Sequence, residues 1–133
     1  MTMQQTPLLM SRIVGRGAQI DPQEEIVTLM AEGTHRQTLK TTWQRANQLA
    51  GALAALGIKP GDRVASFMWN NYRHLELYQA VPSMGAVLHT LNIRLGSTDL
   101  DYIINHAQDK IIFIDEDLLP LLDPLLDKIP SVQ

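Results

Sequence analysis

Three short apolar runs alternate with two longer amphipathic segments between residues 61 and 115. The runs cover residues 63–68, 87–91 and 110–115. Short apolar runs separated by segments of helical length are typical of βαβ units and a parallel sheet. The run at 110–115 is the most apolar, which predicts a strand buried on both faces. This feature predicts an α/β fold class and, by itself, no reaction.

The segments between and before these runs have the spacing of amphipathic helices, because their apolar residues recur three and four positions apart. These residues are Trp43, Ala46, Leu49, Ala50, Leu53 and Leu56 in the first segment, Leu75, Tyr78 and Val81 in the second, and Leu100, Ile103, Ile104 and Ala107 in the third. A last, Leu-rich helix is expected over residues 118–126. Pro82 should kink or end the second helix, and Pro124 should interrupt the last one.

Polar residues and glycines predict where these helices begin and end. The expected N-caps are Thr41 or Thr42, Asn70 or Asn71, Thr98 in a capping-box-like pair with Asp101, and Asp117. Gly57 is expected in the left-handed position after the first helix. Residues 130–133 look like the beginning of another strand.

The N-terminal part is expected to differ from the rest. Residues 1–24 have no clear period and predict an irregular arm with a short helix near residues 8–14. Residues 25–31 and 34–39 flank a turn at Glu32-Gly33 and predict a hairpin outside the parallel set. The chain thus divides into an arm (1–24) and a partial α/β subdomain (25–133). Because a parallel sheet needs further strands, we expect a piece of a longer protein, with a complete small domain as the alternative.

Composition argues against several partners. The net charge of -3, without a cluster of Lys or Arg, argues against nucleic acid. No apolar run reaches the about 18 residues of a membrane span, and the N-terminus has no secretory pattern. The absence of cysteine excludes disulfides and thiolate chemistry, and it fits a reducing cytosol. These observations predict a cytoplasmic globular protein.

The residues alone predict no catalytic constellation and no metal site. Neither glycine-rich phosphate loop is present. The four histidines are scattered and are expected at the surface or on a helix face, with His89, in mid-strand, as the best exception. Residues 69–72 follow a strand, where α/β sheets bind ligands, but a helix cap with packed aromatics is the favoured interpretation. Asp117 is interpreted in the same way, as a cap rather than a ligand-binding residue.

An ordered series of segments resembles a known family. It consists of GDRVA (61–65), WNNYRHLE (69–76), YQAVPSMGAV (78–87), LHTLNIRL (88–95) and YIINHAQDK (102–110). Over roughly residues 25 to 130 it is similar to the N-terminal part of acyl-CoA synthetases, adenylate-forming enzymes, and of their medium- and long-chain fatty acid branch in particular. The resemblance implies that the α/β unit, a hairpin and helix followed by βαβαβα, is part of a larger N-terminal domain.

The resemblance implies an enzyme that uses ATP and Mg²⁺ to convert a fatty acid to an acyl-adenylate and then passes the acyl group to coenzyme A. A carboxylate is a poor acyl donor, whereas AMP is a good leaving group once its phosphates are neutralised. The family's phosphate loop, its adenine and ribose motifs and its catalytic lysine match nothing in these residues. No catalytic residue is therefore assigned, and the 133 residues alone are expected to be inactive and to bind none of these cofactors tightly.

The resemblance also implies one binding segment. In related acetate-activating enzymes, the residues after the strand equivalent to 87–91 line the pocket for the adenine of coenzyme A, and they map to Asn92, Ile93 and Arg94. The guanidinium of Arg94 suits a phosphate. The alternative is a solvent-facing loop in which Asn92 serves only its turn.

Two alternatives stand beside the fatty acid ligase. One is a non-catalytic homologue or dimerisation segment, and the other is an aryl-CoA ligase or a peptide-synthetase adenylation domain. An unpaired sheet edge and uncovered apolar helix faces predict self-association, with a homodimer as its simplest form.

Overall fold

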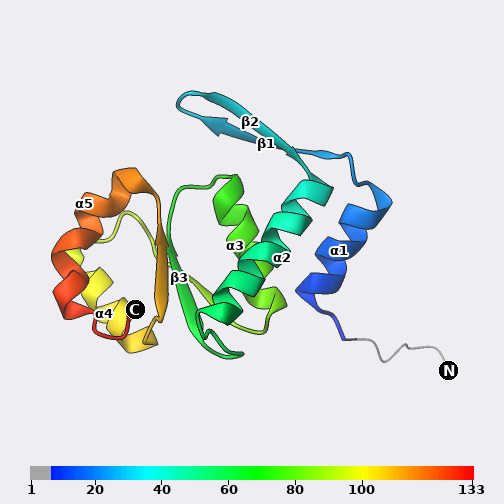
Figure 1. Cartoon of the computed structure of the whole chain (residues 1–133). Helices are drawn as coiled ribbons and strands as arrows, with labels where there is room; N and C mark the ends of the chain where they lie inside the picture. The colour runs from blue at the N-terminus through cyan, green and yellow to red at the C-terminus, as the bar shows by residue number, and fades with distance from the viewer. Residues whose placement is uncertain (1–6) are drawn as a thin grey trace.

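The computed structural model describes residues 7–133 and confirms the α/β fold class (Figure 1). A parallel sheet has the order β4-β3-β5, and an antiparallel hairpin, β1-β2, stands apart from it. The strands are β1 (Glu25–Met30), β2 (Gly33–Thr38), β3 (Arg63–Phe67), β4 (Val87–Thr90) and β5 (Ile111–Ile114). The α-helices are α1 (Met10–Ile20), α2 (Leu39–Ala55), α3 (Tyr72–Ser83), α4 (Ser97–Ala107) and α5 (Leu119–Leu122). None of the helices found in residues 7–133 is both long and apolar enough to cross a membrane.

The central strand β3 is the most buried strand. Val64, Ala65, Ser66 and Phe67 are all fully buried. The sequence predicted that the strand at 110–115 is buried on both faces. Side chains of β5 do pack against the cores on both faces, but all four residues are only half-buried. The reason is topological: β3 pairs with both neighbours, whereas β4 and β5 each pair on one side only within the described residues.

Helices cover the two faces of the parallel sheet (Figure 1). On one face α2 and α3 bury Leu53, Leu77 and Val81 against Val64 of β3. On the other face, α4 and the C-terminal turns pack against Ala65 and Phe67, with Leu100, Ile104, Leu118, Leu122 and Leu125 in the core. Alternate side chains of a strand point to opposite faces, so consecutive residues of β3 serve different cores.

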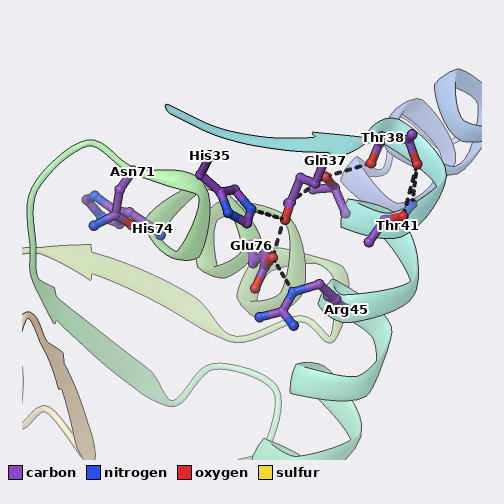
Figure 2. Close-up of polar contacts among 9 residues, drawn as sticks. His35, Gln37, Thr38, Thr41, Arg45, Asn71, His74 and Glu76 are labelled. Carbon is purple, nitrogen blue, oxygen red and sulfur yellow. Dashed lines mark hydrogen bonds and ion pairs between the residues drawn. The ribbon is translucent and has the colours of Figure 1, made fainter. Parts of the chain in front are cut away.

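The predicted hairpin is confirmed, including a positive φ of 131° at Gly33. A buried polar network joins it to the helices (Figure 2). Gln37 of β2 donates from Nε2 to Thr42 Oγ1 at 2.8 Å and to Glu76 Oε1 at 3.2 Å. Arg45 of α2 donates from Nε to the same Glu76 oxygen at 2.6 Å. The hairpin is therefore held to α2 and α3 through polar contacts of its inner face.

The irregular arm expected over residues 1–24 contains a regular helix, α1, which is longer than the short helix predicted near residues 8–14. Gly15 and Ala18 are buried. A Cβ at Gly15 would lie 3.3 Å from the ring of Trp43, so the absence of a side chain lets α1 approach α2 closely. Residues 1–6 of the predicted arm lie outside the described residues.

The predicted helix caps are only partly correct. Thr38, rather than Thr41 or Thr42, caps α2, because its Oγ1 accepts from Thr41 N at 3.1 Å. Asn71 caps α3 as predicted, and its Oδ1 accepts from His74 N at 3.0 Å. Thr98 does not cap α4, which begins after Gly96 without a side-chain cap.

Two predicted helices differ in detail. Helix α3 continues one residue beyond Pro82, and its buried face carries Leu77 and Val81, while Tyr78 is exposed. The Leu-rich helix predicted over residues 118–126 is three short turns, namely the 3₁₀ turn Glu116–Leu118, α5 and the 3₁₀ turn Asp123–Lys128. Pro124 breaks it, because proline has no N–H to donate within a helix.

Gly85 allows the tight turn between α3 and β4. Its φ is 82°, and an added Cβ would lie 3.3 Å from Pro60 Cβ. We expect Gly85→Ala to lower the free energy of unfolding by about 2 kcal/mol, from the left-handed backbone and the steric contact together. Gly57→Ala is the matched control, because Gly57 has a similar φ of 90° and open space around it, so it should cost about half as much. Urea denaturation measures the unfolding free energy of both variants. If the two variants lost the same amount, the contact with Pro60 would contribute nothing.

Candidate functional site

The candidate site is a crevice between the carboxyl ends of β3 and β4. The loop after β3 leads to α3 on one face of the sheet, and the loop after β4 leads to α4 on the other. Adjacent parallel strands whose connections leave in opposite directions form the crevice in which open α/β sheets bind ligands. A hollow of about 360 Å³ lies there, with Trp69 and Asn70 on one side and Asn92, Ile93 and Arg94 on the other.

The segment that the resemblance singled out therefore lies at this crevice. Asn92 and Arg94 are exposed, and Asn92 Oδ1 accepts from the backbone N of Arg94 at 3.0 Å. Asn92 thus serves its own turn, as the alternative interpretation expected. Ile93 packs against the core below and holds the loop in place. Among residues 7–133, no side-chain group forms an ion pair or hydrogen bond with the guanidinium of Arg94, so its donors are available to a ligand.

Helix α3 brings His74 and Tyr78 to the same hollow. His74 was expected at the surface or on a helix face; it lies on α3, and only 6% of it is exposed. Its Nε2 lies 2.9 Å from Ser66 Oγ, and its buried Nδ1 has no hydrogen-bond partner in the described part of the chain. Burial lowers the pKa of His74, while the Trp69 backbone and Asp115 act in the opposite direction.

The lowered pKa of His74 predicts acid sensitivity. The imidazole takes up a proton more readily in the unfolded chain, where its pKa is about 6.5. The stability that His74 contributes is therefore complete above pH 6.5 and is lost as the pH falls through the lower pKa of the folded state. His74→Gln should flatten the fall in unfolding free energy between pH 7 and pH 5 in urea titrations. His106→Gln, at an exposed position, should leave it intact. If the unfolding free energy fell equally steeply with pH in both variants, His74 would not be the cause of the acid sensitivity.

Carboxylates after β5 hold the loop that follows β3. Asp115, only 8% exposed, accepts at Oδ2 from Trp69 N and from Asn71 Nδ2, both at 2.9 Å. The guanidinium of Arg73 lies 3.6 Å from its Oδ1. Asp117 was predicted to be an N-cap, but no side-chain cap bond is found there. Its Oδ2 accepts from Trp69 Nε1 at 2.8 Å instead.

A second hollow, of about 640 Å³, also has Trp69 in its lining. It is bordered by the hairpin turn at Leu29 and Met30 and by the acidic residues 115–117. Trp69 and Asn70 border both hollows.

One further polar pair was not predicted from the sequence. His89 Nδ1 lies 2.8 and 3.0 Å from the two carboxylate oxygens of Asp109, which is fully buried. Burial raises the pKa of the Asp109 carboxyl, against the opposing effects of His89 and Arg63. The partners are 20 residues apart, so no local pattern shows the contact. The pair ties β4 to the segment after α4 and does not border the crevice. Within residues 7–133, no three or more His, Asp or Glu side chains are placed so that together they could hold a metal ion.

Comparison with known proteins defines the class. The mixed α/β arrangement matches a Mycobacterium tuberculosis fatty acyl CoA synthetase with a TM-score of 0.85 and 25% identity, over 94% of this chain and 25% of that one. An anthranilate CoA ligase, AuaEII, has the same fold at 19% identity, with a TM-score of 0.86 over 98% of this chain and 25% of that one. The fold is therefore that of the N-terminal part of the adenylate-forming enzymes.

Sequence comparison places the chain within that class. The model of the AMP-binding enzyme family matches residues 16–133, and the chain belongs to this family. It is 44% identical to a long-chain-fatty-acid–CoA ligase of Thermus thermophilus, over 99% of this chain and 25% of the relative. It is 40% identical to a 3-methylmercaptopropionyl-CoA ligase of Ruegeria lacuscaerulensis (96% and 24%) and 37% identical to a medium-chain-fatty-acid–CoA ligase of Ectopseudomonas oleovorans (98% and 24%). The chain spans about a quarter of the length of these curated relatives.

Proposed function

We propose that this chain is part of an ATP-dependent fatty acid–CoA ligase. The enzyme would convert a fatty acid, ATP and coenzyme A to acyl-CoA, AMP and pyrophosphate through an acyl-adenylate. The observation that carries the proposal is the 44% identity to a long-chain-fatty-acid–CoA ligase across 99% of this chain. A medium-chain-fatty-acid–CoA ligase among the relatives supports the same substrate class.

A second substrate class has its own support. The relative from Ruegeria lacuscaerulensis, at 40% identity, is a ligase for a short sulfur-containing acid. Long-chain, short-chain and aryl acids share the adenylation chemistry and differ in the pocket that receives the acyl group. The assay therefore has to compare acids of different length and shape.

The residues of this chain fit one step of the reaction, the binding of coenzyme A, rather than the activation of the acid by ATP. ATP with Mg²⁺ would supply the activated phosphate, and we assign no catalytic residue for that step to this chain. The crevice fits the nucleotide part of coenzyme A, because its lining offers an unpaired guanidinium, amide side chains and an aromatic ring, and no carboxylate. We assign Asn92, Ile93 and Arg94 to this subsite, with Arg94 as a donor to a phosphate.

Pyrophosphate exchange tests the first half-reaction. The full-length protein should exchange labelled pyrophosphate into ATP only when a carboxylic acid substrate is present, and fatty acids should support faster exchange than 3-methylmercaptopropionate or benzoate. Residues 1–133 alone should support none. Exchange by that piece alone would overturn the assignment of catalysis to other parts of the enzyme. Faster exchange with a non-fatty acid would replace the proposed substrate.

Arg94→Ala tests the coenzyme A subsite. In the full-length enzyme we expect the Michaelis constant for coenzyme A to rise about tenfold, as for the loss of one charge-assisted hydrogen bond, while that for ATP stays the same. Steady-state kinetics with each substrate varied in turn measures both constants. Arg12→Ala, at an exposed position of α1, is the control and should change neither constant. An unchanged constant for coenzyme A in Arg94→Ala would contradict the assignment.

A further inference from the structure

Trp69 is a half-exposed aromatic residue at the carboxyl end of the most buried strand. It follows Phe67 and Met68, which are buried, and 48% of its own surface is exposed. Large aromatic side chains gain most from burial, and within residues 7–133 this tryptophan lies half in water at the sheet's ligand-binding edge.

Two hydrogen bonds orient Trp69. The backbone N of Trp69 donates to Asp115 Oδ2 at 2.9 Å, and the indole Nε1 donates to Asp117 Oδ2 at 2.8 Å. One bond fixes the backbone and the other fixes the ring orientation. A side chain whose conformation is already set loses little freedom on binding, which is the condition for a preorganised contact.

The two hollows that Trp69 borders differ in charge. The larger one is bordered by three carboxylates, those of Asp115, Glu116 and Asp117, and by one guanidinium, that of Arg73. The crevice has Arg94 and no acidic residue in its lining, so it favours an anionic ligand. Its volume of about 360 Å³ is at the lower end of the range for ligand pockets, about 300 to 1,000 Å³, and suits one nucleotide rather than a whole coenzyme A.

From these observations we propose that Trp69 is a base-stacking residue of the crevice and that Asp117 is its positioning residue. The ring receives the purine of an adenine nucleotide, and Arg94, on the opposite wall, meets its phosphate. Aromatic side chains bind bases through stacking, and a guanidinium matches a phosphate with paired donors. This inference rests on the proposed function, because it takes the nucleotide to be that of coenzyme A.

Calorimetric titration of the full-length protein with adenosine 3′,5′-bisphosphate tests the inference without requiring any turnover. Trp69→Ala should weaken binding about tenfold, and Trp69→Phe should restore most of the loss, because phenylalanine keeps a stacking face. Asp117→Asn should give an intermediate affinity, because its amide can still accept from the indole. Trp43→Phe is the control, since Trp43 lies against Gly15 of α1. Equal affinity in Trp69→Ala and the wild type would overturn the inference.

Two further readouts separate the possible failures. If Trp69→Ala does not fold, the fluorescence of the wild type minus that of Trp69→Phe gives the Trp69 signal, which the bisphosphate should quench. No quenching would overturn the inference. The Michaelis constant for coenzyme A should rise in Trp69→Ala, while that for pantetheine, which has no nucleotide, should not change. Equal rises of the Michaelis constant for both thiols would show a merely structural role of Trp69.

Failure of the wild type to form any thioester would reject the proposed function, while the bisphosphate titration would still decide the role of Trp69.

Discussion

Asp115→Ala should lower the free energy of unfolding by about 3 kcal/mol, the largest single effect that we predict for a polar residue. The carboxylate is almost completely buried and accepts from both Trp69 N and Asn71 Nδ2, with Arg73 close to its other oxygen. Alanine would leave these part-buried donors without their acceptor. Urea-induced unfolding followed by circular dichroism measures the change.

Two further variants interpret that result. Asp115→Asn keeps one carbonyl acceptor and should cost about 1 kcal/mol, because a neutral acceptor makes weaker hydrogen bonds than a carboxylate. Asp127→Ala removes an exposed carboxylate and should change the stability by less than about 0.5 kcal/mol. If Asp115→Ala were no more destabilising than Asp127→Ala, the carboxylate would not hold the loop.

Glu76→Ala should lower the free energy of unfolding by about 2 to 3 kcal/mol and loosen the hairpin. Glu76 is 5% exposed and accepts from Gln37 of β2 and from Arg45 of α2 (Figure 2). In the variant, Arg45 can turn to solvent, because its side chain is 47% exposed. Most of the destabilisation should therefore come from the lost hydrogen bond with Gln37 and from the space left at the buried position of Glu76. Hydrogen exchange should become faster in the amides of β1 and β2 and stay the same in β3.

Glu76→Gln and Glu25→Ala are the matched variants. Glu76→Gln keeps an acceptor and should cost about half as much as alanine. Glu25→Ala breaks a 2.7 Å ion pair with Arg36 in which both side chains are more than half exposed, so it should cost less than about 1 kcal/mol. A larger loss in Glu25→Ala than in Glu76→Ala would contradict the view that the buried contact attaches the hairpin.

The features that sequence analysis predicted correctly are those that short stretches determine. The βαβ alternation, the hairpin around Gly33, the left-handed Gly57 and the Asn71 cap all depend on residues within one turn or strand. Backbone sterics and local hydrogen bonds are sufficient to specify them. The family resemblance singled out Asn92, Ile93 and Arg94; they lie at the crevice, and their role in binding coenzyme A stays a prediction.

The errors arose where distant partners decide the outcome. Aspartate is a common helix cap, but the carboxylate of Asp117 accepts a hydrogen bond from the indole of Trp69, 48 residues away. The sequence allowed His74 a surface or helix-face position and did not show that α3 packs it onto Ser66 of β3. β5 is more apolar than β3, yet strand order makes β3 central. In each case the three-dimensional arrangement, which a single sequence does not show, overrides a local preference that is itself sound.

Direct detection of the product tests the central claim, that this chain belongs to a fatty acid–CoA ligase. The full-length protein should be incubated with ATP, Mg²⁺, coenzyme A and a saturated fatty acid, and the products should be identified by mass spectrometry. We predict acyl-CoA, AMP and pyrophosphate in equal amounts, and no AMP when the acid is omitted. Release of ADP and phosphate, or the absence of a thioester with fatty, thioether and aryl acids alike, would contradict the claim.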